Sequence, residues 1–420
     1  MGIGEGGVGR RFTDGISIGV LTRIFHRELV DEVLAETRKT ERRARLLPAR
    51  VVVYYVLALC LFCEDAYEEV MRKLVNGLRF LGTWADGWRV PTTSAISQAR
   101  QRLGEEPLRE LFERVAAPLA VPGTRGAWFR GLRVMAVDGV VLDTPDTPAN
   151  LEEFTKKPHG GGDSPFPQVR VVGLAECGTH AIVAARIDSW KVYERELLNR
   201  LLTDFGPGML VLADRGFFSY DLWVAARNTE AELLWRLPAT VDVPVHDWLP
   251  DGSYRSELLP SQIKRDLNQG KRRNVPDGAK IPVRIVEYMI TNRGGDTETI
   301  RLITSIIDHE QAPAIEIAAL YQQRWEFELT LDEIETHQMA KSRVLRSKSP
   351  ELVRQEIWAL LLTHYAVRSF MREAADDSDT PLDIDRLSFT RSLHVIRRQV
   401  TNQAGFSPSP NTPGNTGDPR

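Results

Sequence analysis

The stretch VMAVDGVVL at residues 134–142 is an apolar run interrupted at its centre by one acid, Asp138. A short apolar run rich in β-branched residues is typical of a buried strand. A second run, MLVLADRG at residues 209–216, carries Asp214 directly after its apolar part. Open α/β sheets place functional groups just after such strands. The two stretches therefore predict strands that each hold one carboxylate.

A third stretch, YQQRWEFE at residues 321–328, has the spacing of a helix. Tyr321, Arg324 and Glu328 stand at i, i+3 and i+7, so a helix of about 3.6 residues per turn places them on one face. Carboxylates from two strands and one helix indicate a divalent-metal site, with phosphoryl transfer on nucleic acid as its chemistry. We predict that Asp138, Asp214 and Glu328 are the catalytic and metal-binding residues.

Each of these acids also has a purely structural interpretation. Asp138 precedes a glycine, and Asp-Gly is a turn dipeptide. Asp214 could pair with the arginine that follows it at the entry of a loop. Glu328 lies four residues after Arg324, so the two could form a plain helical ion pair. These interpretations stay open at the level of sequence.

Other acids compete for the same roles. Asp143 and Asp146 lie in a proline-rich segment, which we predict to be a loop that would fix them poorly. Glu326 lies two residues before Glu328 and would point about 160° away from it on a helix. Asp332 lies one turn beyond Glu328 and is the more plausible auxiliary acid.

The chain resembles the DDE transposases of bacterial insertion sequences, specifically the family typified by insertion element four. The motifs that carry the resemblance are Asp138-Gly139, Asp214-Arg215-Gly216 and the Tyr-x2-Arg-x3-Glu segment. Three further motifs resemble the separate N-terminal domain of that family: Gly19–Arg23, Leu46–Arg50 and Leu103-Gly104.

The resemblance implies an enzyme that cuts DNA at the terminal inverted repeats of its insertion sequence and joins the 3′-hydroxyl ends to target DNA. It implies two Mg²⁺ ions, for which Mn²⁺ can substitute, a homodimer in the synaptic complex and a hairpin intermediate at the excised end. Tyr321 and Arg324 would contact DNA phosphates. On the residues alone, Tyr321 is equally compatible with a core or helix-surface aromatic.

Trp325 and Lys341 complete the predicted DNA contacts. Trp325 could stack on an unpaired base near the cut site, although a core tryptophan is the favoured interpretation of its position. In the family pattern, six residues separate the glutamate from a lysine that holds a phosphate, and this chain has Glu335 at the position of that lysine. Lys341, six residues further, is the predicted substitute.

Two alternatives to a transposase follow from these residues. One is a catalytically inactive, transposase-derived DNA-binding protein, which Glu335 favours because an acid cannot neutralise a phosphate. The other is a metal-dependent nuclease that cuts without strand transfer. Terminal inverted repeats flanking the gene would favour a mobile element over both.

The amino-acid composition says less about function than these motifs do. The formal net charge of −3 over 420 residues does not indicate a nucleic-acid binder as a whole. Basic residues nevertheless gather at Lys271-Arg272-Arg273 and in Lys341–Lys348, which has four basic residues and no acid. Such runs are usually solvated faces and support DNA binding only in context.

The cysteines and the longest apolar run favour a cytoplasmic protein without a membrane anchor, and the resemblance to bacterial transposases implies association with the nucleoid. Cys60, Cys63 and Cys177 are too few for a disulfide framework. Cys60 and Cys63 have metal-type spacing but no second pair, so we predict a buried structural role. The run Val51–Cys63 is uncharged for 13 residues, which is short of the ~20 needed to span a bilayer.

The pattern of elements predicts an α/β protein. Its RNase H-like mixed-sheet catalytic core is interrupted by a mainly β insertion, with an all-α N-terminal domain and a helical C-terminal region. The predicted core elements are strands 132–142, 168–176 and 181–188, helix 194–203, strand 209–213, helix 220–227, strands 232–237 and 300–308, and helix 314–339. The predicted divisions are a DNA-binding domain at 1–130, a catalytic domain at 131–345 with the insertion at about 238–300, a helical region at 346–400 and a disordered tail at 401–420.

Overall fold

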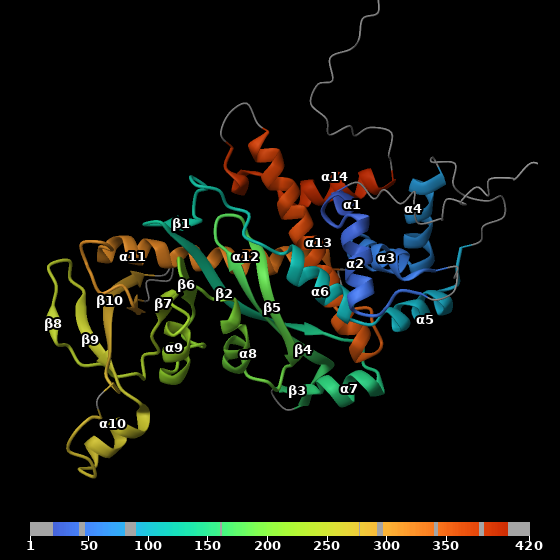
Figure 1. The fold of residues 1–420 in the computed structure, drawn as a ribbon. Helices are drawn as coiled ribbons and strands as arrows, with labels where there is room; N and C mark the ends of the chain where they lie inside the picture. Colours follow the sequence, from blue (N-terminus) through green and yellow to red (C-terminus); the bar gives the residue numbers. More distant parts are fainter. Residues whose placement is uncertain are drawn as a thin grey trace, which may run out of the picture.

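The computed structural model describes residues 20–41, 47–79, 90–159, 162–276, 278–291, 297–339, 343–377 and 382–401. Lys341 and all of the predicted disordered tail except Thr401 lie outside these residues. One large mixed sheet and a group of helices beside it make up most of the described chain (Figure 1). No helix in the described part is long and apolar enough to cross a bilayer.

The N-terminal part is helical, as predicted. Its helices are α1 (Val20–Ile24), α2 (Arg27–Glu36), α3 (Ala49–Leu61), α4 (Tyr67–Arg79), α5 (Thr93–Leu103) and α6 (Glu106–Val115). Helix α5 begins where its capping residue predicts, because the Thr92 side chain accepts a hydrogen bond from the Ala95 N–H at 3.3 Å. It ends at Gly104, whose φ of 73° is a conformation that glycine adopts readily.

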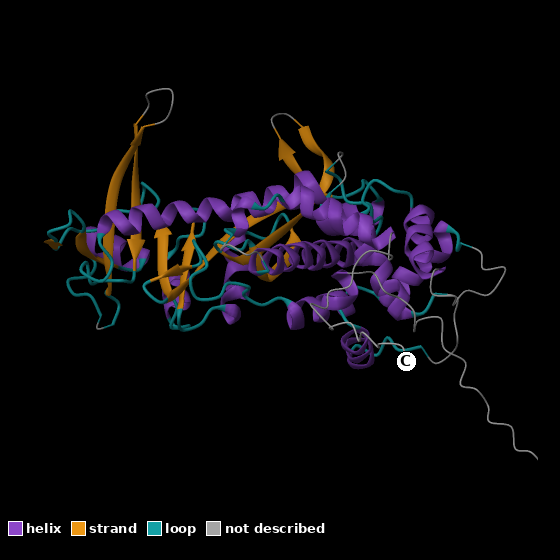
Figure 2. Ribbon diagram, turned by 90° about the horizontal axis from the view of Figure 1, so that it is seen from above, coloured by secondary structure: helices purple, strands orange, loops and turns teal. Residues whose placement is uncertain are grey.

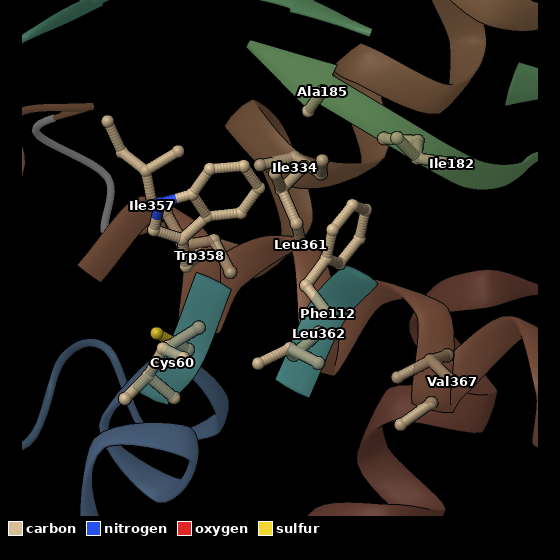
Figure 3. Packing of buried hydrophobic residues seen from close by; sticks show 14 of the residues in the cluster. Cys60, Phe112, Ile182, Ala185, Ile334, Ile357, Trp358, Leu361, Leu362 and Val367 are labelled. Atoms are coloured by element: carbon tan, nitrogen blue, oxygen red, sulfur yellow. The ribbon is translucent and has the colours of Figure 1, made fainter. Parts of the chain in front are cut away.

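The long helix α13 (Pro350–Asp376) packs between these N-terminal helices and the sheet. Phe112 of α6 and Trp358 of α13 have ring centroids 5.4 Å apart, and the Cys60 thiol of α3 donates to the Glu356 carbonyl at 3.7 Å. Figure 3 shows Ile182 of the sheet on the other side of the same cluster. Cys60 is fully buried, in keeping with its predicted structural role.

Helices from both ends of the sequence thus share one apolar core. Helix α3 has nearly all of its side chains buried, so it needs apolar neighbours all round, and α13 supplies one side. After α13 come η5 (Ile384–Arg386) and α14 (Phe389–Thr401), which packs on α13 and α4. The predicted domain boundaries near residues 130 and 346 remain predictions.

The sheet centre has the strand order β5-β4-β2-β6-β7. Strands β5, β4 and β2 pair antiparallel, whereas β2, β6 and β7 pair parallel. The strands of the whole sheet are β1 (Trp128–Phe129), β2 (Leu132–Asp143), β3 (Lys156–His159), β4 (Gly162–Glu176), β5 (Ala181–Ser189), β6 (Met209–Ala213), β7 (Glu232–Arg236), β8 (Asp247–Trp248), β9 (Tyr254–Leu258), β10 (Ile281–Thr291) and β11 (Thr297–Thr304).

Helices cover both faces of the sheet centre. Alternate residues of β2 face opposite sides: Val134 and Ala136 join the core shared with α13, while Met135 and Val137 join a second core. The second core lies under α8 (Glu194–Leu201), which continues as η2 (Leu202–Asp204), and α9 (Tyr220–Arg227). Helix α7 (Pro148–Phe154) lies beside β4 and α13.

The predicted insertion continues the same sheet. Strand β11 pairs with β7, and β10, β9 and β8 follow outward. It also contains a helix, α10 (Ser261–Asn268), that the alternating pattern did not indicate. Strand β4 begins earlier than the predicted residue 168, because it forms a hairpin with β3 despite Pro165 and Pro167. Figure 2 shows this hairpin and the β10–β11 hairpin projecting from the same side of the molecule.

Candidate active site

Strand register brings the two aspartates together. Val137 of β2 pairs with Ala213 of β6 in parallel. Asp138 and Asp214 are the next residues on each chain, so they stand at the same level on neighbouring strands, which lie roughly 4.8 Å apart. Asp138 sits inside β2, so the interpretation of Asp138-Gly139 as a turn is wrong.

The third acid, Glu328, comes from a helical stretch that packs against β2. The predicted helix 314–339 consists of α11 (Ala314–Tyr321), a 3₁₀ turn η3 (Gln322–Arg324), α12 (Trp325–Asp332) and a π-helical segment η4 (Glu333–Gln338). The 3₁₀ turn ends at Arg324, directly before α12. Short 3₁₀ and π segments within helices often mark functional positions.

Arg324 and Tyr321 join the three acids. The Arg324 Nη1 donates to Asp138 Oδ2 at 3.1 Å, and its Nη2 donates to Glu328 Oε1 at 2.8 Å. The Tyr321 hydroxyl donates to Asp214 Oδ1 at 3.5 Å. The helical ion pair between Arg324 and Glu328 is therefore present, but the same guanidinium also holds Asp138. The structure thus brings together all three predicted acids with the predicted tyrosine and arginine.

The site is crowded with negative charge in a partly buried setting. Burial raises the pKa of Asp138 to about 6, opposed by the Gly139 N–H and Arg324 and assisted by the charges of Glu328 and Asp214. The Arg324 side chain is 7% exposed, and its Nε has no hydrogen-bond partner among the described residues. A single guanidinium therefore faces more carboxylate charge than it can neutralise.

The raised pKa makes the free protein more stable in acid. The folded state holds the Asp138 proton up to about pH 6, whereas an unfolded aspartate loses it near 3.8. The contribution of this proton to stability is therefore complete below about pH 4 and is lost as the pH rises to about 6. We expect Asp138→Asn to raise the midpoint of thermal unfolding in EDTA above pH 6 and to have little effect near pH 4. A stabilisation that does not change with pH would contradict this account, and Asp146→Asn, at an exposed acid, is the control.

Three other predictions are settled by side-chain positions. Trp325 is 58% exposed, so its interpretation as a core residue is wrong, and the Arg324 guanidinium carbon lies 5.2 Å from its ring centroid. Glu326 accepts a hydrogen bond from the Gly178 N–H, so it points away from Glu328 as predicted. Asp143 is the last residue of β2 and accepts from Gln168 at 2.9 Å, so its predicted place in a loop is wrong.

Asp332 and Glu335 lie beyond Glu328, where the chain departs from the family pattern. Asp332 accepts a hydrogen bond from Thr336 at 2.6 Å, and its auxiliary role remains a prediction. Glu335 is half-buried, and burial and the charges of Asp332 and Asp143 raise its pKa against the opposing effect of Arg343. Lys341, the predicted substitute for the family lysine, lies outside the described residues.

One element at the site was not anticipated. The first turn of α8 meets the loop after Asp214, where Arg195 Nε donates to the Gly216 carbonyl at 2.7 Å. Helix 194–203 was predicted, but only as part of the fold. No local pattern connects α8 with two strands that are distant in sequence.

The donor set suits a divalent cation of the Mg²⁺ type, which prefers a few carboxylate oxygens completed by water and phosphate. As the side chains stand, no three His, Cys, Asp or Glu residues of the described chain are close enough to hold a metal ion. The guanidinium of Arg324 lies between Asp138 and Glu328. The negative charges of Glu328 and Asp214 help to raise the pKa of Asp138, and a metal cation would offset this repulsion. The residues therefore fit such an ion, on condition that Arg324 gives up these two partners.

Comparison with known proteins gives the family. The profile described as "Insertion element 4 transposase N-terminal" matches residues 15–113, and that described as "Transposase DDE domain" matches residues 129–365. The transposase InsG for insertion sequence element IS4 of Escherichia coli K12 is 31% identical over 383 residues, which cover 91% of this chain and 82% of InsG. The putative transposase InsZ of the same strain is 26% identical over 218 residues, covering 50% and 68% of the two chains.

Among solved structures, the piggyBac transposase in a synaptic complex with hairpin DNA matches with a TM-score of 0.47 and 12% identity, over 91% of this chain and 80% of that one. The DDE-domain profile spans more than half of the chain, and the InsG match extends over nearly all of it. This chain therefore belongs to the DDE transposases of the insertion element 4 family.

Proposed function

We propose that this protein cuts DNA at the terminal inverted repeats of an insertion sequence and joins the resulting ends to target DNA. The observation that carries the proposal is that Asp138 and Glu328 share Arg324, while Asp214 lies level with Asp138 and contacts Tyr321. Three carboxylates from two strands and a helix, with an arginine and a tyrosine among them, suit phosphoryl transfer better than any other reaction of these residue types.

Asp138, Asp214 and Glu328 would hold two Mg²⁺ ions, or Mn²⁺ in their place. When bound, such a pair activates the attacking oxygen and stabilises the leaving oxygen of an in-line displacement at phosphorus. The contribution of the protein is rigid placement. Asp138 lies in a central strand and accepts a hydrogen bond from the Gly139 N–H at 2.8 Å, and Asp214 directly follows β6 at the same level.

Arg324, Tyr321 and Trp325 would contact DNA. Arg324 is paired with carboxylates in the free protein, and a phosphate would offer it an equally good bidentate partner while a cation takes over the carboxylates. Trp325 is exposed next to it and can stack on an unpaired base without rearrangement. Arg324 would thus exchange partners when DNA and metal bind together.

The remaining DNA contacts and the assembly follow from the fold and the family. The strand order β5-β4-β2-β6-β7 supports an RNase H-like core. The N-terminal helices would bind the terminal repeats, and the exposed Lys271-Arg272-Arg273 segment after α10 would follow the phosphate backbone. We further propose a synaptic homodimer that works in the bacterial cytoplasm, at the nucleoid.

The function is tested with full-length protein and a DNA fragment that carries the sequences flanking its gene. With Mg²⁺, the expected products are 3′-hydroxyl ends at the terminal repeats, followed by their joining to a supercoiled target plasmid. Cleavage without any joining would favour the nuclease alternative. Binding without cleavage, in Mg²⁺ and in Mn²⁺, would favour an inactive DNA-binding protein.

That second candidate rests on Glu335. Its half-buried carboxylate lies near Asp143 and Asp332. The negative charge around η4 would therefore repel a phosphate. Glu335→Lys is expected to strengthen binding of the cleaved DNA end and to raise cleavage or joining, more at low salt than at moderate salt. Glu310→Lys, at an exposed acid, is the control for a general gain in positive charge. Unchanged or reduced activity in Glu335→Lys would mean that other groups hold the end.

A further inference from the structure

A fourth acid stands beside the two aspartates, on the opposite face of the sheet. Glu194 is the first residue of α8. A Cβ built on Gly139 would lie 3.5 Å from Glu194 Cγ, and one built on Gly216 would lie 3.8 Å from Glu194 Oε2. These glycines follow Asp138 and Asp214 by one and two residues. The Glu194 side chain therefore lies close to the glycines that follow both aspartates.

The alternation of β2 explains how Glu194 gets there. Even-numbered residues of β2 face α12 and α13, and odd-numbered ones face α8 and α9. The Asp138 side chain therefore lies on the face of the sheet where Arg324 lies, and Gly139 faces α8. Because Gly139 has no side chain, Glu194 can come close to β2 at this point. Asp138 Oδ1 accepts the Gly139 N–H, so both acids reach the same glycine. Glu328 approaches the site from one face of the sheet and Glu194 from the other.

Glu194 is loosely held by protein groups. Its nearest cation is Arg170, whose Nε lies 3.7 Å from Glu194 Oε1. That distance is too long for a hydrogen bond, and this buried Nε has no hydrogen-bond partner among the described residues. Arg170 instead donates from Nη1 to the Val192 carbonyl. The Glu194 side chain remains 38% exposed.

A simpler role for Glu194 is to stabilise the start of α8. Acids in the first turn interact favourably with the helix dipole. Glu196 lies in the same turn and pairs with Arg200 at the surface. Glu196 provides a matched control, because it lies in the same first turn but is not among the nearest neighbours of Gly139 or Gly216.

We propose that Glu194 is a fourth carboxylate of the active site, which binds a divalent ion together with Asp138 and Asp214, directly or through a bound water. The inference rests on the proposed function and names a residue beyond the three acids of the family motif. Four carboxylates would then surround the place where β6 ends beside the middle of β2, from both faces of the sheet. Glu194 would hold the ion from the side that Glu328 does not reach.

The test measures metal binding by full-length protein without DNA. Mn²⁺ titration followed by electron paramagnetic resonance is carried out on wild type, Glu194→Gln, Glu196→Gln and Asp138→Ala. We expect Glu194→Gln to weaken Mn²⁺ binding by about 10-fold or more, and Glu196→Gln to leave it within about two-fold, a margin typical of surface sites. Glu194→Asp keeps the charge and is expected to fall between wild type and Glu194→Gln.

Arg170→Met separates the two roles of Glu194. If Glu194 matters only as the partner of Arg170, Arg170→Met will weaken Mn²⁺ binding as much as Glu194→Gln does, and the proposal fails. We expect Arg170→Met to preserve or strengthen it. Thermal unfolding in EDTA shows that each variant is folded at the temperature of the titration.

The outcomes also separate this inference from the proposed function. Unchanged Mn²⁺ binding in Glu194→Gln, with loss in Asp138→Ala, overturns the role of Glu194 and leaves the three-acid site intact. Unchanged binding in Asp138→Ala overturns the metal site itself, and the fourth acid with it. Loss in Asp138→Ala and Glu194→Gln but not in Glu196→Gln supports both.

Discussion

Asp138→Ala, Asp214→Ala and Glu328→Ala are each expected to abolish Mg²⁺-dependent cleavage while binding to the terminal repeats stays largely unchanged. Each change would remove a proposed metal ligand and no proposed recognition contact. A metal ion at developing charge is worth several kcal/mol, so the loss should be about 10³-fold or more. Cleavage of labelled end DNA and a gel-shift titration with the same DNA measure the two properties.

The design must separate metal loss from misfolding. Asp138 and Glu328 share the largely buried Arg324, so Asp138→Asn and Glu328→Gln, which keep hydrogen-bond acceptors, accompany the alanine variants. Asp146→Ala, at an exposed acid just after β2, is the matched control and should cleave normally. Full cleavage by any one of the three alanine variants would remove that residue from the site.

The second large effect concerns the contact between α13 and the helical segment that follows Glu328. Glu333 begins the π-helical segment directly after α12. Its Oε2 accepts from Arg368 Nε and lies within hydrogen-bond distance of His364 Nε2, both at 3.0 Å. Burial acts to raise the Glu333 pKa, but His180, His364 and Arg368 outweigh it and hold that pKa well below its ordinary 4.5. Arg368 is 2% exposed, so its ion pair with Glu333, which links η4 to α13, lies inside the core.

Arg368→Met is expected to destabilise the protein by about 3–5 kcal/mol, because it leaves Glu333 buried without its cation. The double variant Glu333→Gln with Arg368→Met should recover much of the loss, since no uncompensated charge remains. Urea unfolding at neutral pH measures both. Arg72→Met, which breaks the exposed pair with Glu69, should cost less than about 1 kcal/mol.

The pH dependence of this pair provides a second check. A carboxylate with a lowered pKa contributes stability above its unfolded value, here 4.5, and that stability is lost as the pH falls toward the folded value. The difference between wild type and the double variant should therefore shrink below about pH 4.5. A loss below 1 kcal/mol in Arg368→Met would show that the pair is not an anchor.

The sequence was informative wherever one element acts by itself. The apolar runs around Asp138 and Asp214 predicted two strands, and β6 has the predicted bounds. The spacing of Tyr321, Arg324 and Glu328 predicted that they share a face, although a 3₁₀ turn interrupts the helix there. Such patterns are local because they depend on the period of a strand or a helix, which is a property of the backbone.

The predictions that failed concern exposure and context. Trp325 was favoured as a core residue, yet its side chain is exposed on α12. The insertion contains mainly strands, as predicted, but the alternating pattern indicated neither α10 nor the pairing of β11 with β7. The spacing of apolar residues along one element does not predict which other element will pack against it.

By itself, the sequence determined the strands that carry two acids, the helix that carries the third and the family to which they belong. Only the tertiary structure decided that Asp138 and Asp214 stand level, because the register of β2 on β6 depends on residues that are far apart in the sequence, such as Val137 and Ala213. The same holds for the bridge of Arg324 between Asp138 and Glu328, for α13 within the N-terminal helices and for Glu194 beside Gly139. Each is a contact between distant segments, and its geometry is set when apolar surfaces are buried together rather than by the local pattern of either segment.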